Sequence, residues 1–276
     1  MSIKYAYLGP AGTFTEAALL KIAASDDQLI AYANVTAALD AVRKGEANKA
    51  LVPIENSVEG VVARTLDELA SGEPLVITAE TTLPVTFSLM TLENKDPKDI
   101  KSIATHPHAE SQCRSFIAKN YPNAQVIETA STAAAAKGLS KGDYDAAIGA
   151  AIAAKNYQLK IIAEDIGDNT SAVTRFVVVE KPGKSPAATG KDRTSLAVFI
   201  AIDHAGALLE ILNEFAKHQV NLSFIQSRPT GSQLGHYHFI IDAEGHIDDK
   251  PVAAALAGLK EICEDIRFLG SYPQAK

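Results

Sequence analysis

The feature that most constrains this chain is an alternation of short apolar segments with helix-like segments before residue 180. Strands that alternate with helices form βαβ units, so the sequence predicts an α/β fold with largely parallel sheets. The expected strands are Ile3–Leu8, Lys49–Ile54, Leu75–Thr78, Ser102–Thr105, Ala146–Gly149, Leu159–Ile162 and Phe176–Val179. The expected helices are Thr15–Ala24, Thr36–Lys44, Val61–Ala70, Pro107–Asn120 and Thr132–Leu139.

The alternation stops at a segment rich in Pro, Gly, Ser and Lys, which we interpret as a linker over residues 182–192. The segments after it have the order βαββαβ, which is typical of a ferredoxin-like domain. Its expected strands are Thr194–Ile202, Asn221–Ser227, Tyr237–Ala243 and Ile266–Leu269, and its expected helices are Gly206–His218 and Pro251–Glu261.

Charge and composition narrow the possible partners. The net charge is −7 and Lys and Arg form no cluster, which argues against nucleic acid or an anionic membrane as the main partner. The apolar runs are shorter than the roughly 20 residues of a membrane helix, and no signal peptide is visible, so we expect a cytoplasmic protein. Cys113 and Cys263 stand far apart, which favours reduced thiols and provides no zinc-type spacing.

Polar residues follow several of the expected strands. Thr13 and Glu16 have the spacing of a capping box, and Asn56-Ser57, His106 and Ser131-Thr132 stand at similar positions. Helix N-termini carry unpaired N–H donors, and several of them at one cleft would bind a dicarboxylate. Taken singly, each residue is more often a structural cap than a ligand.

The sharpest candidate is Thr174-Arg175-Phe176, where a polar turn leads into a strand. The planar fork of arginine suits a carboxylate, and a neighbouring hydroxyl can donate to a leaving group. In isolation, such a pair is more often an exposed pair of polar residues without a function. The sequence leaves open whether Glu55 and His106 have chemical or structural roles.

Taken together, the stretches GPAGTFTEAA, PIENSVEG, HPHAESQC, STAAAA and DNTSAVTRF resemble the prephenate dehydratase family. GALLEIL and QSRP resemble the amino-acid-binding ACT domain of that family. The resemblance implies a two-lobed catalytic domain, similar to periplasmic binding proteins, over residues 1–181, and an ACT domain over 193–276. Lobe 1 would take 1–77 plus 164–181, and lobe 2 would take 78–163. The match begins at Gly9, so we expect a monofunctional enzyme without a chorismate mutase domain.

The resemblance also implies roles for individual residues. The essential threonine of the family matches Thr174. The substrate-binding positions correspond to Thr13, Asn56, Ser57, Ser131 and Thr132, with Arg175 and Phe176 beside the threonine, and we expect Arg175 to anchor a carboxylate. The allosteric phenylalanine site would comprise Gly206, Ala207, Leu208, Gln226, Ser227, Arg228 and Pro229 at a contact between subunits.

The chain departs from the family pattern at several positions. His108 stands where the family often has glutamine, and Ser171 and Ala172 replace a pair of asparagines. Gln226 replaces the glutamate of the usual ESRP, and Ala205 replaces a proline. The role of His108 and the strength and sign of phenylalanine regulation therefore stay open.

The reaction implied is the loss of carbon dioxide and water from prephenate to give phenylpyruvate. Aromatisation drives it, so we expect no metal and no cofactor. An arogenate dehydratase, which uses the aminated analogue, and a binding protein without catalysis are the alternatives. We expect a homo-dimer or tetramer.

Overall fold

The strands of the computed structural model, which describes residues 2–93, 95–200, 204–230 and 237–275, form three sheets. The first contains β1 (Lys4–Leu8), β2 (Gln28–Tyr32), β3 (Lys49–Asn56), β4 (Gly60–Val61), β5 (Val76–Pro84) and β11 (Val173–Glu180). Its order is β2-β1-β3-β11-β5, with β4 paired to β3. The helices α1 (Phe14–Leu19), α2 (Val35–Arg43) and α3 (Ala63–Ser71) connect its strands.

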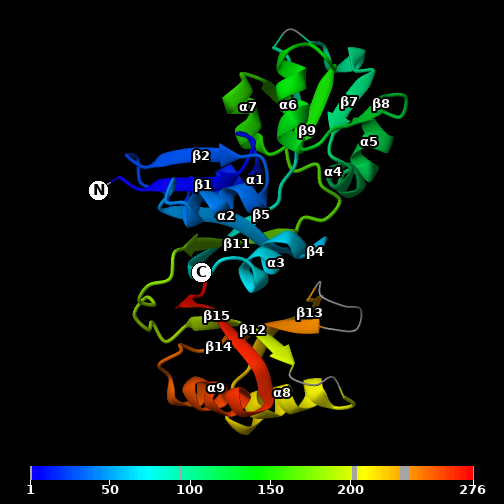
Figure 1. Cartoon of the computed structure of the whole chain (residues 1–276). Helices are drawn as coiled ribbons and strands as arrows, with labels where there is room; N and C mark the ends of the chain where they lie inside the picture. Colours follow the sequence, from blue (N-terminus) through cyan, green and yellow to red (C-terminus); the bar gives the residue numbers. More distant parts are fainter. Residues whose placement is uncertain (1, 94, 201–203, 231–236, 276) are drawn as a thin grey trace. The chain divides into compact units, whose positions relative to one another are not determined.

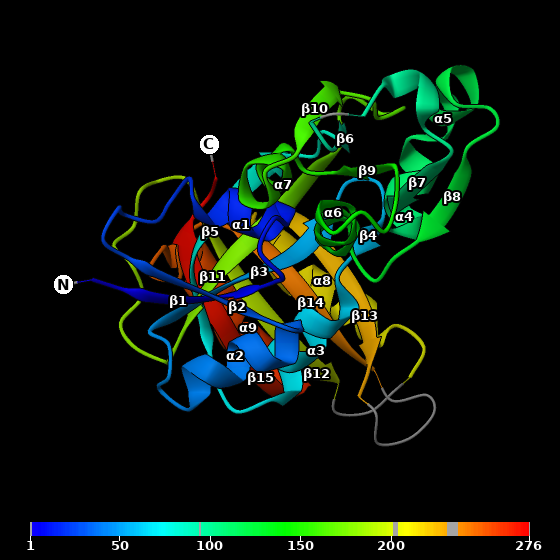
Figure 2. The same cartoon turned by 90° about the horizontal axis from the view of Figure 1, so that it is seen from above.

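The second sheet has the order β10-β6-β9-β7-β8. Its strands are β6 (Ser88–Thr91), β7 (Ser102–Thr105), β8 (Gln125–Glu128), β9 (Ala146–Gly149) and β10 (Lys160–Ala163). Figure 2 shows β10 and β8 at its two edges. A short 3-10 helix, η1 (Pro97–Asp99), and the helices α4 (Pro107–Gln112), α5 (Arg114–Asn120), α6 (Thr132–Ser140) and α7 (Ala151–Tyr157) lie between these strands in the sequence.

Helices cover both faces of the second sheet, because alternate residues of its strands point to opposite sides. Leu89 and Ile103 pack with Ile117 of α5 on one face. Met90 packs with Leu139 of α6 on the other. In Figure 1, α6 and α7 accordingly lie on the side of the strands opposite α4 and α5. The strands of the second sheet are therefore fixed by helices packed on both faces.

The third sheet has the order β13-β14-β12-β15 and is antiparallel in the pairs β12–β14, β12–β15 and β13–β14. Its strands are β12 (Asp192–Ile200), β13 (Leu222–Pro229), β14 (Tyr237–Glu244) and β15 (Cys263–Pro273). The helices α8 (Ala207–Lys217) and α9 (Lys250–Ile262) lie on one face of it (Figure 1), where Ile211, Phe215 and Leu259 join its core.

Contacts along the chain divide it into two units. The first comprises residues 1–38, 51–62 and 82–176, and the second comprises 39–50, 63–81 and 177–276. Residues 63–81 group with the C-terminal part because α3 contacts β15 and Arg228 forms a bidentate ion pair with Asp67, at 2.8 and 2.7 Å. The division by contacts therefore differs from the predicted boundary at residues 182–192, which stays a prediction.

The predicted α/β class and the βαββαβ order of the C-terminal part are confirmed. The sheets of the N-terminal part are mixed rather than largely parallel, because β9 and β10 both run antiparallel to β6. Strand β5 stays in the first sheet as far as Pro84, beyond the predicted lobe boundary after residue 77. Residues 201 and 202, the predicted end of a strand, lie outside the described residues. No described helix is long and apolar enough to cross a membrane.

Asp145 generates a prediction about stability. Its carboxylate accepts hydrogen bonds from Lys95 Nζ at 2.7 Å and from the backbone N–H groups of Lys101 and Ser102 at 2.9 and 3.0 Å. The bond from Lys95, aided by the other donors, lowers the pKa of Asp145 from 3.8 to about 2. Because the folded pKa lies below the unfolded one, the carboxylate stabilises the fold above pH 4, and this contribution is lost as the pH falls toward 2.

We therefore expect Asp145→Asn to lower the free energy of unfolding by roughly 2 kcal/mol at pH 7, with a deficit that shrinks below pH 4. Urea unfolding at pH 7 and at pH 3 measures both values. Asp143→Asn, at an exposed position nearby, is the control. A deficit of the same size at both pH values would contradict this account.

Candidate active site

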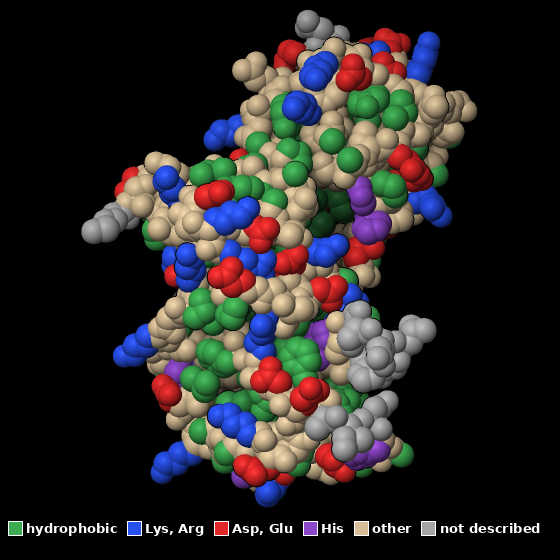
Figure 3. Space-filling view, viewed as in Figure 1, with side chains coloured by type: hydrophobic (Ala, Val, Ile, Leu, Met, Phe, Trp, Pro, Cys, Tyr) green, Lys and Arg blue, Asp and Glu red, His purple; other side chains and the backbone are tan. Residues whose placement is uncertain are grey.

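The first unit contains a cavity of about 950 Å³, a size typical of small-molecule sites. Figure 3 shows a hollow with hydrophobic side chains inside and histidine side chains beside it. Of the residues predicted to bind or transform a substrate, six line this cavity: Thr13, Asn56, Ser131, Thr132, Thr174 and Phe176. The structure thus brings together segments that lie far apart in the sequence.

Strand ends explain this convergence. Thr13 follows β1, Asn56 ends β3, and Ser131 follows β8 after a short turn. In α/β sheets such ends open onto a common crevice. Thr13 and Ser131 also serve as N-caps, because Thr13 Oγ accepts from the N–H of Glu16 at 3.3 Å and Ser131 Oγ accepts from the N–H of Ala134 at 3.0 Å. These side chains are therefore structural caps that also face the cavity.

The capping box predicted at Thr13 has a variation. The Glu16 carboxylate reaches back to the N–H of Gly12, at 2.6 Å, and accepts from Asn156 Nδ2 at 2.8 Å. This second contact joins α1 to α7. The turn that carries Thr13 is therefore fixed at both of its ends.

The hydrogen bond between Asn56 and Thr174 is the central interaction of the cavity. Asn56 Oδ1 accepts from the backbone N–H groups of Val58 and Glu59, at 2.8 and 2.9 Å. These two backbone donors identify the oxygen end of the amide, so the nitrogen end must face Thr174. Asn56 Nδ2 donates to Thr174 Oγ at 2.8 Å. The threonine oxygen is thus an acceptor toward Asn56, and its own proton remains available for a partner in the cavity.

Arg175 does not line the cavity with its neighbours. Successive side chains of a strand point to opposite faces, so Thr174 and Phe176 face the cavity while Arg175 faces away. Its Nε lies 3.4 Å from Glu55 Oε2, and its side chain is 9% exposed. The predicted direct contact between Arg175 and a substrate carboxylate therefore has no support in this geometry. Glu55 is outside the lining as well.

Ser57 is also absent from the lining. Its Oγ accepts from the N–H of Val173 at 2.9 Å, and its own N–H donates to the Val173 carbonyl at 2.9 Å. Val173 directly precedes Thr174. Ser57 therefore fixes the backbone next to the threonine, and the predicted contact with substrate has no support here.

Two histidines lie at the cavity. His106 caps α4 by accepting from the N–H of His108 at Nδ1, at 3.3 Å, which assigns the proton of a neutral ring to Nε2. The rings of His106 and His108 meet edge to face, with centroids 4.8 Å apart. Burial, followed by the charge of His108, lowers the pKa of His106 against the opposing effect of Glu59 and Glu128. His106 is therefore a neutral donor at pH 7.

Several lining residues were not predicted from the sequence, among them Phe14, Tyr32, Glu59, Phe87 and Gln112. Phe14 and Phe87 meet edge to face with centroids 5.5 Å apart, and with Phe176 they supply an apolar wall. Phe14, Glu59 and Gln112 lie within the quoted stretches GPAGTFTEAA, PIENSVEG and HPHAESQC, but their residue types alone did not single them out. Tyr32 and Phe87 lie outside those stretches. Among the described residues, no cluster of three or more His, Cys, Asp or Glu side chains is arranged to hold a metal ion.

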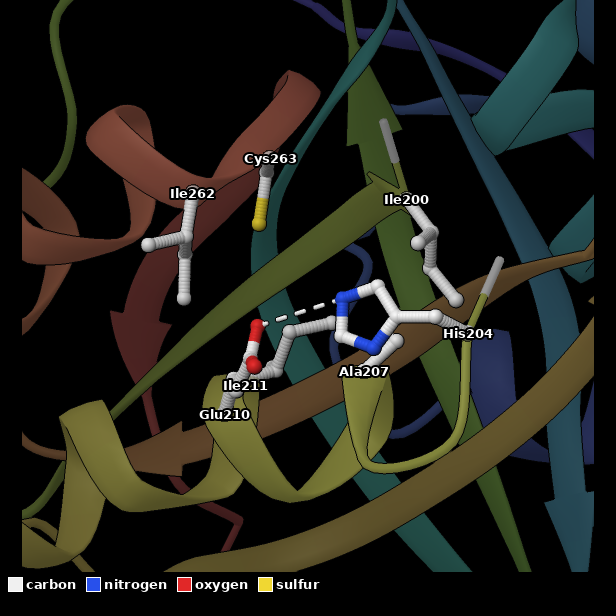
Figure 4. Close-up of a pocket in the computed structure, with 7 residues that line it drawn as sticks. All are labelled: Ile200, His204, Ala207, Glu210, Ile211, Ile262 and Cys263. Atoms are coloured by element: carbon white, nitrogen blue, oxygen red, sulfur yellow. Dashed lines mark ion pairs between the residues drawn. The ribbon is translucent and has the colours of Figure 1, made fainter. Parts of the chain in front are cut away.

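A smaller cavity of about 150 Å³ lies in the second unit, between the end of β12, the start of α8 and the start of β15. Figure 4 shows His204 pointing toward Glu210, with Nε2 3.6 Å from Oε2, and Ile200, Ile211 and Cys263 around them. Of the predicted allosteric residues only Ala207 lines this cavity, next to Gly206 at the helix start. Gln226, Ser227, Arg228 and Pro229 belong to β13 and do not line it.

Comparisons with known proteins identify two families along the chain. Residues 5–184 match the family described as prephenate dehydratase, and residues 194–261 match the ACT domain. The chain is 46% identical to a prephenate dehydratase of Amycolatopsis methanolica over 99% of this chain and 89% of that protein. A crystal structure of prephenate dehydratase in complex with L-Phe from Arthrobacter aurescens superposes with a TM-score of 0.93 and 51% identity, over 98% of this chain and 90% of that one.

A second solved structure has a different function. GqqA, described as a novel type of quorum quenching acylase, superposes with a TM-score of 0.87 and 26% identity, over 98% of each chain. Nearly the same backbone thus occurs in proteins with two different described activities.

The proximity of His106 and His108 predicts how the pKa of His106 responds to mutation. We expect the ring of His106 to titrate below 6.5, and His108→Gln to move that midpoint upward by removing a neighbouring positive charge. Because folding disfavours the protonated ring, its contribution to stability falls as the pH drops through 6.5. Titration of the ring resonances by NMR measures the midpoint. His218→Gln, in the second unit, is the control, and a His106 midpoint above 6.5 would contradict the argument.

Proposed function

The chain belongs to the prephenate dehydratase family and is accordingly a lyase, and from that premise we propose how its residues convert prephenate to phenylpyruvate, carbon dioxide and water. The observation that carries the proposal is the donation from Asn56 Nδ2 to Thr174 Oγ. It leaves the threonine hydroxyl oriented to donate to another group in the cavity.

Thr174 acts, in this proposal, on the departing ring hydroxyl. The C–O bond to that hydroxyl and the C–C bond to the ring carboxylate both break, and the electron pair from the C–C bond completes the aromatic ring. The threonine O–H hydrogen bonds to the leaving oxygen, whose charge grows as the bond breaks, and water forms once a proton reaches that oxygen. Thr174 is a weak acid, so it stabilises and orients the leaving group rather than serving as the proton source.

The polar lining orients the substrate dianion. Helix α6 begins at the cavity, and its first N–H groups, with the hydroxyls of Ser131 and Thr132, form a donor set suited to a carboxylate. Thr13 also lines the cavity, but its hydroxyl donates to the Leu8 carbonyl at 3.2 Å, so its part is to hold the turn after β1 in place. Phe14, Phe87 and Phe176 provide an apolar wall that fits the ring and excludes water.

Arg175 and Ser57 have indirect roles in this proposal. Arg175 is largely buried beside Glu55, and Ser57 holds the backbone of Val173. Both flank Thr174 in space or in sequence. They therefore hold the strand that carries Thr174 in place and do not contact the substrate.

Phenylalanine is the proposed effector. The ACT domain supplies Gly206, Ala207 and Leu208 at the start of α8, whereas Gln226–Pro229 lie on β13. Because one chain does not bring the two groups to one cavity, we propose that a second copy of the chain completes the site. A homo-dimer or tetramer in the cytoplasm fits this arrangement, and the two cysteines are free thiols as that compartment requires.

Arogenate remains the alternative substrate: among the described lining residues Glu59 provides a carboxylate, but it accepts a hydrogen bond from Gln112 and does not by itself decide between a keto group and an ammonium group. Binding without catalysis, the other alternative that the sequence left open, does not agree with membership of this family of lyases. Turnover of both substrates by the same preparation, followed as phenylpyruvate and as phenylalanine, separates the three functions.

The role of Thr174 predicts the effect of near-isosteric replacement. We expect Thr174→Val to lower kcat on prephenate by about 10²- to 10⁴-fold, while Thr174→Ser keeps the hydroxyl and most of the activity. Phenylpyruvate formation at neutral pH measures both. The matched control is Thr129→Val, since Thr129 bonds to the Ser131 carbonyl and is not part of the lining. A fully active Thr174→Val enzyme would contradict the donor role.

Effector binding predicts a separate result. We expect phenylalanine to raise the melting temperature of the wild-type protein and to change its rate of prephenate turnover, and we expect Gln226→Ala to reduce both effects. Differential scanning fluorimetry and the same turnover assay measure them. Tyrosine is the control ligand. The proposal fails if phenylalanine shifts neither quantity at millimolar concentration.

A further inference from the structure

Glu59 lines the cavity but has no role in the proposed reaction. It follows Asn56 by three residues, in the turn between β3 and β4, and it lines the cavity. Its backbone N–H donates to Asn56 Oδ1 at 2.9 Å. The same bond fixes the orientation of the Asn56 amide toward Thr174. The backbone of Glu59 is thus linked to Thr174 by two hydrogen bonds, through Asn56.

The side chain of Glu59 reaches α4. Gln112 Nε2 donates to Glu59 Oε1 at 2.9 Å, and His108 Nδ1 lies 3.7 Å from Glu59 Oε2. His108 and Gln112 are four residues apart on a helix, so they lie on one face of it. Both side chains line the cavity. One carboxylate therefore contacts two successive turns of α4.

These contacts connect two separate walls. The turn that carries Glu59 belongs to the first sheet, whereas α4 begins directly after β7 of the second sheet. Thr174 and Asn56 lie on the first wall, and His106, His108 and Gln112 lie on the second. A hydrogen bond to a charged acceptor is stronger than one between neutral groups, so this bond favours one separation of the two walls.

Direct contact with the substrate is a poor role for this carboxylate. The substrate is a dianion, and a like charge close to either carboxylate would weaken binding. The carboxylate oxygens of Glu59 already have Gln112 and His108 as partners. The side chain is therefore better suited to joining protein elements than to holding the ligand.

We infer that Glu59 is a positioning residue that ties the turn bearing Asn56 to α4 and so holds the two walls of the cavity at the spacing the substrate needs. This inference rests on the proposed function. Without the tie, substrate binding must itself order the walls, whereas Asn56 and Thr174 keep their mutual hydrogen bond. Loss of the side chain therefore weakens binding more than it slows the chemical step.

The test compares Glu59→Ala and Glu59→Gln in steady-state turnover of prephenate. We expect Glu59→Ala to raise KM about 10-fold while kcat changes by less than about 3-fold. Glu59→Gln keeps an acceptor for Gln112 and should restore KM to within about 3-fold of wild type. Glu110→Ala removes a carboxylate of α4 that is not part of the lining, and it should change neither constant.

A double-mutant cycle keeps the test decisive if Glu59→Ala destabilises the fold. Gln112→Ala removes the other end of the same bond and should reproduce the rise in KM. Its combination with Glu59→Ala should raise KM little further, because the two side chains act through one bond. Additive effects, an unchanged KM in Glu59→Ala, or a fall in kcat at constant KM would overturn the inference. If wild-type protein does not turn over prephenate, the proposed function fails first and the inference fails with it. Wild-type turnover with insensitive variants overturns the inference alone.

Discussion

The orientation of one amide group determines how the cavity can act. Asn56 Oδ1 is held by two backbone N–H groups of its own turn, and Nδ2 is thereby directed at Thr174 Oγ. If the amide were turned the other way, its oxygen would accept the threonine proton. The hydroxyl would then have no proton to donate into the cavity. Ser57, which pairs with Val173, holds the strand on which Thr174 lies. The local backbone thus fixes the direction of a single proton.

The fold supplies the remaining constraints through its strand ends. Residues after β1, β3 and β8 meet at one cavity because their strands are held in sheets and enclosed by helices. The N-caps of α1 and α6 are positioned by backbone hydrogen bonds, so their hydroxyls need no further support. The result is a donor-rich surface built largely from elements that the fold requires in any case.

The sequence predicted the strand ends and the caps, because glycine turns and capping residues are local signals. It missed β2, an edge strand whose side chains are exposed or half-buried, and it missed β6, β8 and α7, which are only four, four and seven residues long. It also placed Arg175 at the substrate. The face on which a strand residue lies depends on its register within the sheet, which tertiary contacts determine. The contact of Glu59 with α4 is equally non-local, because Glu59 and Gln112 are 53 residues apart in the sequence.

The fold alone does not decide the reaction, since an acylase superposes on nearly the whole chain at 26% identity. The hydrogen bond at Thr174 bears on which role its hydroxyl can take. A threonine nucleophile needs a base that accepts its proton, yet among the described residues the hydrogen bond recorded at its hydroxyl oxygen comes from an amide N–H. A bond donated to the oxygen lowers its nucleophilicity and makes its proton more acidic. This arrangement supports the role proposed for the hydroxyl, which is to assist a departing oxygen.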